Sequence, residues 1–252
     1  MSAVPQTRHP RHPQPLATAT TTPDATAGAL ADALNRRFHA PVVRLGPRAA
    51  LSGASPTGFP ALDAATGLGG LPLGRITEIV GHPTSGRETI AARTVAAAPA
   101  GALCAWVDVA AAVDVAYLAG RGVALDRLAI LHPPRPLDAL GMAGHLAASG
   151  HFAVVVLDAL ADLPPGGGVD LDIARFIRVV TPGLARSRTA LVVLTAPERH
   201  CRPLAHGAAL RIALAKVGLL RAGGVLRGWR TRATILKSPG LQGGESGIEV
   251  WL

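Results

Sequence analysis

The residues best suited to chemistry lie in the stretch Gly81-His-Pro-Thr-Ser-Gly-Arg-Glu88, which has the frame of a phosphate-binding loop. That loop follows the pattern G-x-x-x-x-G-K-[ST], in which glycines let the backbone approach phosphate, the lysine neutralises it and the hydroxyl binds magnesium. Gly81 and Gly86 hold the glycine positions, but Arg87 takes the lysine position and Glu88 the hydroxyl position. The frame therefore indicates a nucleotide site whose two active positions have changed.

Both replacements alter what the loop could do. Arginine is a planar fork and seldom replaces a compact lysine, and a carboxylate at position 88 either repels phosphate or holds magnesium in an altered geometry. Thr89 is no simple substitute, because the next helical position points about 100° away. We expect at most weak binding of ATP and Mg²⁺, with no catalytic residue and no separate metal site. The residues that would hold a nucleotide, if binding is retained, are Gly81, Thr84, Ser85, Gly86, Arg87, Glu88, Thr89 and Asp158.

The elements around the loop alternate between strand and helix patterns. Strands are predicted over 76–80, 102–107, 128–131, 153–157 and 190–195, and helices over 87–98, 112–120, 137–149 and 170–187. Alternation with near-continuously apolar strands predicts an α/β fold, with a mostly parallel central sheet and helices on both faces. Segments 210–220, 228–236 and 247–251 resemble strands joined by Gly-rich turns, which predicts an antiparallel C-terminal extension.

The N-terminal part of the chain differs from this core. Residues 1–24 are rich in Pro, Thr and Ala without apolar periodicity, so we expect a disordered tail. Residues 25–56 are expected to hold an amphipathic helix over 25–38, a short strand over 42–45 and a linker, because leucines and Phe38 recur at four-residue spacing in the helix. The core domain is predicted to span 57–252.

The charge of the chain favours a polyanionic partner. Lys and Arg number 25 against 16 acidic residues, and only Lys216 and Lys237 are lysines, so a general preference for arginine could by itself explain Arg87. Between Arg199 and Gly244 there is no acidic residue. This segment is either a DNA-binding or partner-binding surface, or a set of solvated strand faces. The candidate contact residues are Arg199, Arg202, Arg227, Trp229, Arg230, Arg232 and Lys237.

Other function classes find little support. The two cysteines, Cys104 and Cys201, form no C-x-x-C pair, which favours a reducing cytoplasm over a disulfide or zinc framework. The spacing of His200, Cys201 and His206 does not match known zinc sites. The sequence contains no run of about 18 apolar residues, so no membrane-spanning helix is predicted.

Three segments together resemble the RecA recombinase family: Thr57-Gly-Phe-Pro-Ala-Leu-Asp63, Gly69-Gly-Leu-Pro-Leu-Gly-Arg-Ile-Thr-Glu-Ile-Val-Gly81 and the loop that follows. The resemblance extends upstream to Ala29-Leu-Ala-Asp-Ala-Leu34 and Val43-Arg-Leu-Gly46, which are similar to the family's N-terminal helix and docking strand. Downstream it includes Trp106-Val-Asp108, Val154-Val-Val-Leu-Asp158 and Thr231-Arg-Ala-Thr-Ile-Leu-Lys237. It implies a RecA-like P-loop core without the family's separate C-terminal domain.

Departures from the family pattern occur at several catalytic positions besides the loop. The family's water-activating glutamate is matched by Ala110, and its nucleotide-sensing polar pair by Thr195 and Ala196. Asp158 matches a Walker-B-like carboxylate and could orient a metal-bound water. The two DNA-channel loops are matched by Pro164–Gly168 and Pro197–Pro203, which are short and different in composition, so strand exchange is not expected.

The resemblance is strongest to the degenerate ImuA group of the family, which implies an accessory protein in DNA repair and SOS-type mutagenic translesion synthesis. Such a protein acts by binding, with a recombinase, a translesion-polymerase-like protein and single-stranded DNA as partners, and forms hetero-oligomers or associates weakly with itself. The implied location is the bacterial cytoplasm, at the nucleoid, and no membrane contact is expected. Two alternatives stay open: a divergent DNA-dependent ATPase of the recombinase type, and a cell-division regulator that acts through protein contacts alone.

Overall fold

The computed structural model describes residues 53–160, 167–197, 201–239 and 244–251, the last as backbone only, together with the isolated helical residues Ala33 and Arg36. The chain separates into a unit of Met1–Ala50 and a compact unit of Leu51–Leu252. The predicted tail over 1–24, the strand over 42–45 and the helix over 25–38, apart from Ala33 and Arg36, lie outside the described residues. The description below concerns the compact unit.

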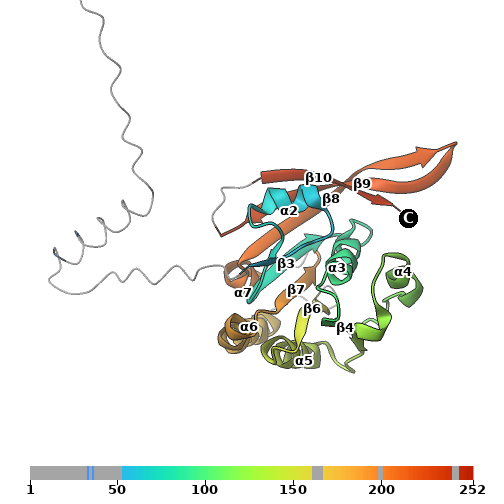
Figure 1. Cartoon of the computed structure of the whole chain (residues 1–252). Helices are drawn as coiled ribbons and strands as arrows, with labels where there is room; N and C mark the ends of the chain where they lie inside the picture. The colour runs from blue at the N-terminus through green and yellow to red at the C-terminus, as the bar shows by residue number, and fades with distance from the viewer. Residues whose placement is uncertain are drawn as a thin grey trace, which may run out of the picture. The chain divides into compact units, whose positions relative to one another are not determined.

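A central sheet with the strand order β10-β9-β8-β3-β7-β6-β4-β5 forms the core (Figure 1). Its parallel strands are β3 (Arg75–Gly81), β4 (Leu103–Asp108), β5 (Leu128–Leu131), β6 (Phe152–Asp158), β7 (Ala190–Thr195) and β8 (Leu210–Ala222). Because these strands run the same way, their carboxyl ends meet at one edge, where ligand-binding loops of such sheets gather. The predicted α/β fold with a mostly parallel sheet is confirmed.

Helices cover both faces of the sheet (Figure 1). They are α2 (Pro60–Thr66), α3 (Arg87–Ala96), α4 (Val115–Gly120), α5 (Pro136–Ala148), α6 (Gly167–Ser187) and α7 (Arg202–Gly207), with a short 3-10 turn, η1 (Leu125–Arg127). Leu62 of α2 and Ile90 of α3 pack in one buried cluster with Trp106. Leu140 of α5 and Leu204 of α7 belong to the cluster on the opposite face. The near-continuous apolar strands are thus buried on two sides, as parallel sheets require.

The C-terminal strands extend the sheet in the antiparallel sense, as predicted. β8 pairs with β9 (Val225–Lys237), and β9 pairs with β10 (Gly244–Trp251). The β8–β9 turn consists of Gly223 and Gly224, both with positive φ, which is the backbone that a two-residue hairpin turn of type I′ needs. The two long strands form a hairpin that projects beyond the rest of the sheet (Figure 1).

Several short elements were not predicted from the sequence. β1 (Ala54–Ser55) pairs with β2 (Leu71–Pro72) in a small separate sheet, and α2 and α7 lie in segments without a clear period. The helix expected over 112–120 begins only at Val115, because the Asp114 carboxylate accepts hydrogen bonds from the Ala116 and Tyr117 amides at 2.8 and 3.1 Å. This is an N-cap, which sets the start of a helix.

Candidate nucleotide site and basic surface

The phosphate-loop frame lies where the sequence predicts it, between the carboxyl end of β3 and the amino end of α3. Thr84 and Gly86 adopt the left-handed conformation, with φ of 68° and 98°. The Ser85 amide donates to the His82 carbonyl at 3.0 Å, and the Ile90 amide donates to the Gly86 carbonyl at 2.9 Å as the helix begins. The chain therefore turns sharply from strand to helix, in the manner of a phosphate-binding loop.

Gly81 is held by close packing inside the loop. A Cβ atom at this position would lie 2.2 Å from the Ser85 hydroxyl and 3.2 Å from the Leu214 Cβ. Ser85 is itself buried, and its backbone carbonyl accepts a hydrogen bond of 2.7 Å from the Thr231 hydroxyl in β9. The loop is thus held by the close packing of Gly81 on Ser85 and by the hydrogen bond from Thr231 of β9.

The Arg87 side chain is bonded within the loop. Its Nε atom donates to the Glu88 carboxylate at 2.5 Å, and its Nη1 atom donates to the Gly81 carbonyl at 3.4 Å. The Arg87 side chain is only 8% exposed, against 38% for Glu88. The two replaced positions neutralise each other within the loop, and no hydroxyl stands at position 88. This donor set does not fit a magnesium-bound nucleotide.

The hydroxyl of Thr89, the residue after Glu88, contacts α4. Its Oγ1 lies 2.6 Å from the Tyr117 hydroxyl in α4, and the residue is buried. The Arg121 guanidinium stacks over the Tyr117 ring at 4.7 Å from the centroid, a cation–π contact. Thr89 therefore joins α3 to α4, in agreement with the argument that it cannot replace the missing hydroxyl at position 88.

Asp108 and Asp158 end the neighbouring strands β4 and β6 and are register partners. Asp108 is 1% exposed; its Oδ2 accepts from the Val113 amide at 2.9 Å, while its backbone carbonyl lies 3.0 Å from His132 Nδ1. Ala110 follows in the loop after β4, and its methyl group cannot take up a proton from water. Among the described residues, no three His, Cys, Asp or Glu side chains gather as a metal site.

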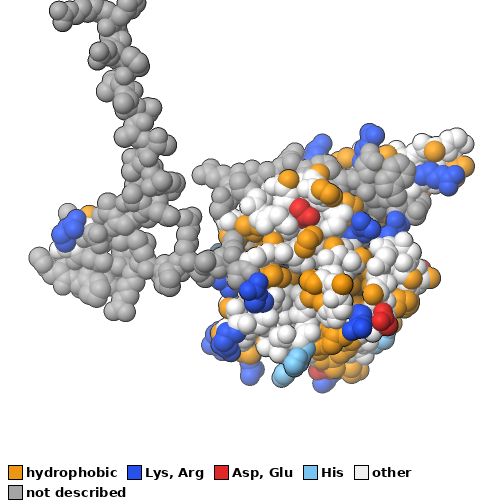
Figure 2. Space-filling view, viewed as in Figure 1, with side chains coloured by type: hydrophobic (Ala, Val, Ile, Leu, Met, Phe, Trp, Pro, Cys, Tyr) orange, Lys and Arg blue, Asp and Glu red, His pale blue; other side chains and the backbone are white. Residues whose placement is uncertain are grey.

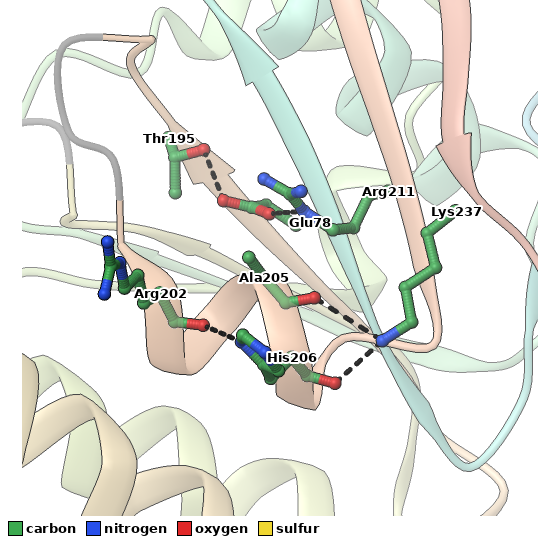
Figure 3. Close-up of polar contacts among 7 residues, drawn as sticks. All are labelled: Glu78, Thr195, Arg202, Ala205, His206, Arg211 and Lys237. Carbon is green, nitrogen blue, oxygen red and sulfur yellow. Dashed lines mark hydrogen bonds and ion pairs between the residues drawn. The ribbon is translucent and has the colours of Figure 1, made fainter.

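Glu78 is the centre of a buried polar network that the sequence did not reveal (Figure 3). This β3 residue is 2% exposed, accepts a hydrogen bond from the Thr195 hydroxyl at 3.1 Å and forms an ion pair with Arg211 of β8. Thr195 is thereby tied to the sheet interior. Nothing in the sequence around Glu78 marks this role, because its partners are 117 and 133 positions away.

Lys237 lies beside this network and caps α7 (Figure 3). Its Nζ atom donates to the carbonyls of Ala205 at 3.4 Å and His206 at 2.7 Å, at the helix end where cations are favoured. Desolvation, followed by the nearby Arg211 charge, lowers the pKa of Lys237, and Glu78 opposes that shift. One of the candidate contact residues therefore has a structural partner.

The remaining described candidate contact residues lie on α7 and on β9. Arg202 begins α7, and Arg199 lies outside the described residues. The others lie on β9, namely Arg227, Trp229, Arg230 and Arg232. Trp229 is half-buried, with the Lys216 ammonium 4.9 Å from its ring centroid. Figure 2 shows Lys and Arg side chains at the projecting end of the hairpin. The positive charge of this segment thus lies on α7 and along the length of the β8–β9 hairpin.

The strand–loop–helix site at the carboxyl edge of a parallel sheet defines the class of P-loop NTPase-type domains. Residues 27–182 match the RecA N-terminal domain, and the chain therefore belongs to the RecA family. It is 33% identical over 224 residues to the RecA protein of Rubrobacter xylanophilus, covering 78% of this chain and 65% of that protein. It is 32% identical over 224 residues to that of Cutibacterium acnes, covering 78% and 64%. The chain thus spans less than two thirds of the length of these relatives.

Membership of the family confirms the resemblance that the motif string indicates, at the level of the RecA superfamily. Within the described residues, no helix is long and apolar enough to cross a membrane. The site residues that sequence reasoning missed are Glu78, Tyr117, Arg211 and Thr231. Only Tyr117 carried a local signal, since it follows the Asp114 cap by three positions, whereas the others act through partners distant in sequence.

Proposed function

We propose that this RecA-family chain is an accessory protein that acts by binding and does not turn over nucleotide. The observation that carries the proposal is the Arg87–Glu88 ion pair inside the phosphate loop. A loop arginine already bonded to a carboxylate and a backbone carbonyl offers phosphate little uncompensated positive charge, and Coulomb attraction to phosphate is what a P-loop lysine supplies.

Two further positions support the same proposal. The side chain of Ala110 cannot activate water, and Thr195 is hydrogen-bonded to Glu78 in the interior of the sheet. We infer that neither the position of the activating glutamate nor that of the sensing pair serves catalysis, and a general base alone typically contributes on the order of 10²-fold or more. The architecture nevertheless stays intact, which favours a role for the scaffold as a binding surface.

In cellular terms, we place this binding function in DNA repair and SOS-type mutagenic translesion synthesis, in the bacterial cytoplasm at the nucleoid. The partners would be the true recombinase and a translesion-polymerase-like protein, with single-stranded DNA as a further ligand of the arginine-rich segment. Family membership supports the link to recombination and DNA, and the altered loop supports an accessory role in place of a motor role.

The test combines a turnover assay with an association assay on the full chain. We expect no DNA-stimulated ATP hydrolysis above background, and co-purification with a purified recombinase bound to single-stranded DNA. An Arg87→Ala variant should leave that association unchanged, since the loop does not take part in it. ATP turnover that disappears in Arg87→Ala or Asp158→Ala would instead establish a divergent ATPase. Absence of any association, with or without DNA, would reject the accessory role.

A further inference from the structure

The outer half of the β8–β9 hairpin, residues 215–222 of β8 with residues 225–230 of β9, forms a projecting arm (Figure 1). On one side β8 pairs with β9 along the arm, through register pairs such as Leu219 with Trp229 and Ala222 with Val225, with register shifts between Lys216 and Gly218, around Val217, and between Leu220 and Arg221. On its other side β8 pairs with β3 only over Leu210–Leu214. Among the described residues, no strand pairs with residues 215–222 on that side. The arm therefore presents a strand edge of backbone donors and acceptors.

The side chains of the arm are unusually apolar for a projecting element. Val217 and Leu219 of β8 are each 51% exposed, and Val225 and Leu226 of β9 are 55% and 41% exposed. Edge strands that project into water are commonly protected by charge, proline or bulges, because they otherwise pair with other chains. β8 carries Lys216 and two register shifts, but no proline, over this edge. Here exposed aliphatic residues flank the edge, which is the combination that favours strand addition by a partner.

The charge of the arm restricts the partner. Arg221 at the turn and Arg227 on β9 are exposed, and the segment between Arg199 and Gly244 contains no acidic residue. Figure 2 shows basic and hydrophobic side chains next to one another at this end of the molecule. A second copy of the chain would bring the same cations together and be repelled, whereas an acidic segment would be attracted.

The same features favour a protein segment over single-stranded DNA. Bases stack on open aromatic faces. The aromatic residue of the arm, Trp229, is half-buried and has the Lys216 ammonium over its ring. The exposed residues of the arm are aliphatic, and aliphatic side chains pack well against the alternating side chains of an added strand.

The geometry points to a docking site for an extended acidic segment of a partner protein, which adds as a strand to the edge of β8 over residues 215–222. Main-chain hydrogen bonds to β8 would supply affinity. Aliphatic residues of the segment would pack on Val217 and Leu219, and its carboxylates would pair with Arg221 and Arg227. This inference rests on the proposed function, in that the chain acts by binding, and it names the chemistry of one partner.

A labelled peptide of alternating valine and glutamate, about eight residues long to match the edge at ~3.3 Å per residue, is a direct probe. Fluorescence anisotropy with the full chain should show binding about tenfold tighter than that of the valine–lysine counterpart. Methylation of alternate backbone nitrogens in the valine–glutamate peptide should abolish binding, because it removes the donors that pair with β8. Leu219→Glu should weaken binding by about tenfold or more. Val179→Glu on α6, where Val179 is 68% exposed, is the matched control and should bind as the unaltered chain does.

Circular dichroism of both variants establishes that they are folded. Equal binding of the two peptides, binding of the methylated peptide, or equal effects of Leu219→Glu and Val179→Glu would each overturn the docking site. The docking site would also be overturned if oligothymidylate bound the chain, if Leu219→Glu weakened that binding, and if the peptide did not bind. The arm would then be a nucleic-acid surface. If the recombinase still associates while the peptide does not bind, the docking site is refuted and the proposed function stands.

Discussion

The hydroxyl of Thr231 in β9 donates a hydrogen bond of 2.7 Å to the backbone carbonyl of Ser85 in the phosphate loop. Both residues are buried, and they are 146 positions apart in the chain. The contact joins the base of the projecting arm to the loop at the amino end of α3. Together with the register pairing of Gly81 with Leu214 of β8, it connects the hairpin to the loop, so a substitution at Thr231 should also affect the loop.

Replacing Thr231 with valine keeps the shape of the side chain and removes the donor. The Ser85 carbonyl then loses its partner in a buried place, so we expect the free energy of unfolding to fall by about 1–3 kcal/mol. Urea denaturation followed by circular dichroism measures the loss. Thr181→Val is the control, because the Thr181 hydroxyl bonds to the Ile177 carbonyl on an exposed face of α6. A smaller loss in Thr231→Val than in Thr181→Val would contradict the structural role of this contact.

Gly81→Ala tests the packing of the loop itself. The new Cβ would meet the Ser85 hydroxyl at 2.2 Å, so the loop must shift, and we expect overpacking to cost about 1–3 kcal/mol of stability. Thermal or urea unfolding measures it. Gly120→Ala, in α4 where nothing lies within 4 Å of an added Cβ, should be neutral or slightly stabilising. Equal stabilities of the two variants would show that the loop is looser than described.

The ion pair between Glu78 and Arg211 is best tested by a double-mutant cycle. Glu78→Leu leaves a mostly buried guanidinium without its carboxylate, and we expect a loss of about 3–5 kcal/mol. The double variant Glu78→Leu with Arg211→Leu should be more stable than Glu78→Leu alone, because an apolar pair leaves no unpaired charge. Additive losses in the cycle would mean that the two side chains do not interact across β3 and β8.

Restoring the two altered loop positions should restore affinity for nucleotide. In Arg87→Lys with Glu88→Thr, the ion pair is gone and a hydroxyl stands at the magnesium position, so we expect magnesium–ATP to bind about tenfold more tightly or better than to the unaltered chain. Isothermal titration calorimetry with and without magnesium measures this. Asp126→Thr, which removes an exposed carboxylate on η1, controls for net charge. Tight binding by the unaltered chain would refute the view that the loop has lost its ligand.

The strand–helix alternation was predictable because its signals are local. The apolar runs over 128–131 and 190–195 coincide with β5 and β7. β7 is buried along its whole length, and a strand covered on both faces needs nearly every side chain apolar, whereas the edge strand β5 is only partly buried. α7 was missed because six residues are too few for an apolar period, although Pro203 in its first turn is a helix-start signal. The elements that the sequence revealed are those that lie in a clear apolar pattern.

The candidate site likewise has features that the sequence predicts and features that only the fold reveals. The loop frame follows from contiguous residues, and the unfavourable chemistry of Arg87 and Glu88 follows from their types. Their pairing with each other could not be deduced, because either side chain could have extended toward solvent. The ties from Glu78 to Arg211 and from Thr231 to Ser85 depend on which strands become neighbours. Sheet order is set by the whole core, and no short segment encodes it.

The close approach of Gly81 to the Ser85 hydroxyl also changes what a glycine in such a motif signifies. At 2.2 Å an added side chain would force the Ser85 hydroxyl or the loop to shift, whether or not a nucleotide is ever present. Selection for a foldable chain is then enough to preserve this glycine, independently of any ligand of the loop. A phosphate-loop frame can in this way outlast its chemistry, and in chains of this kind the residue at the lysine position is a better guide to function than the glycines are.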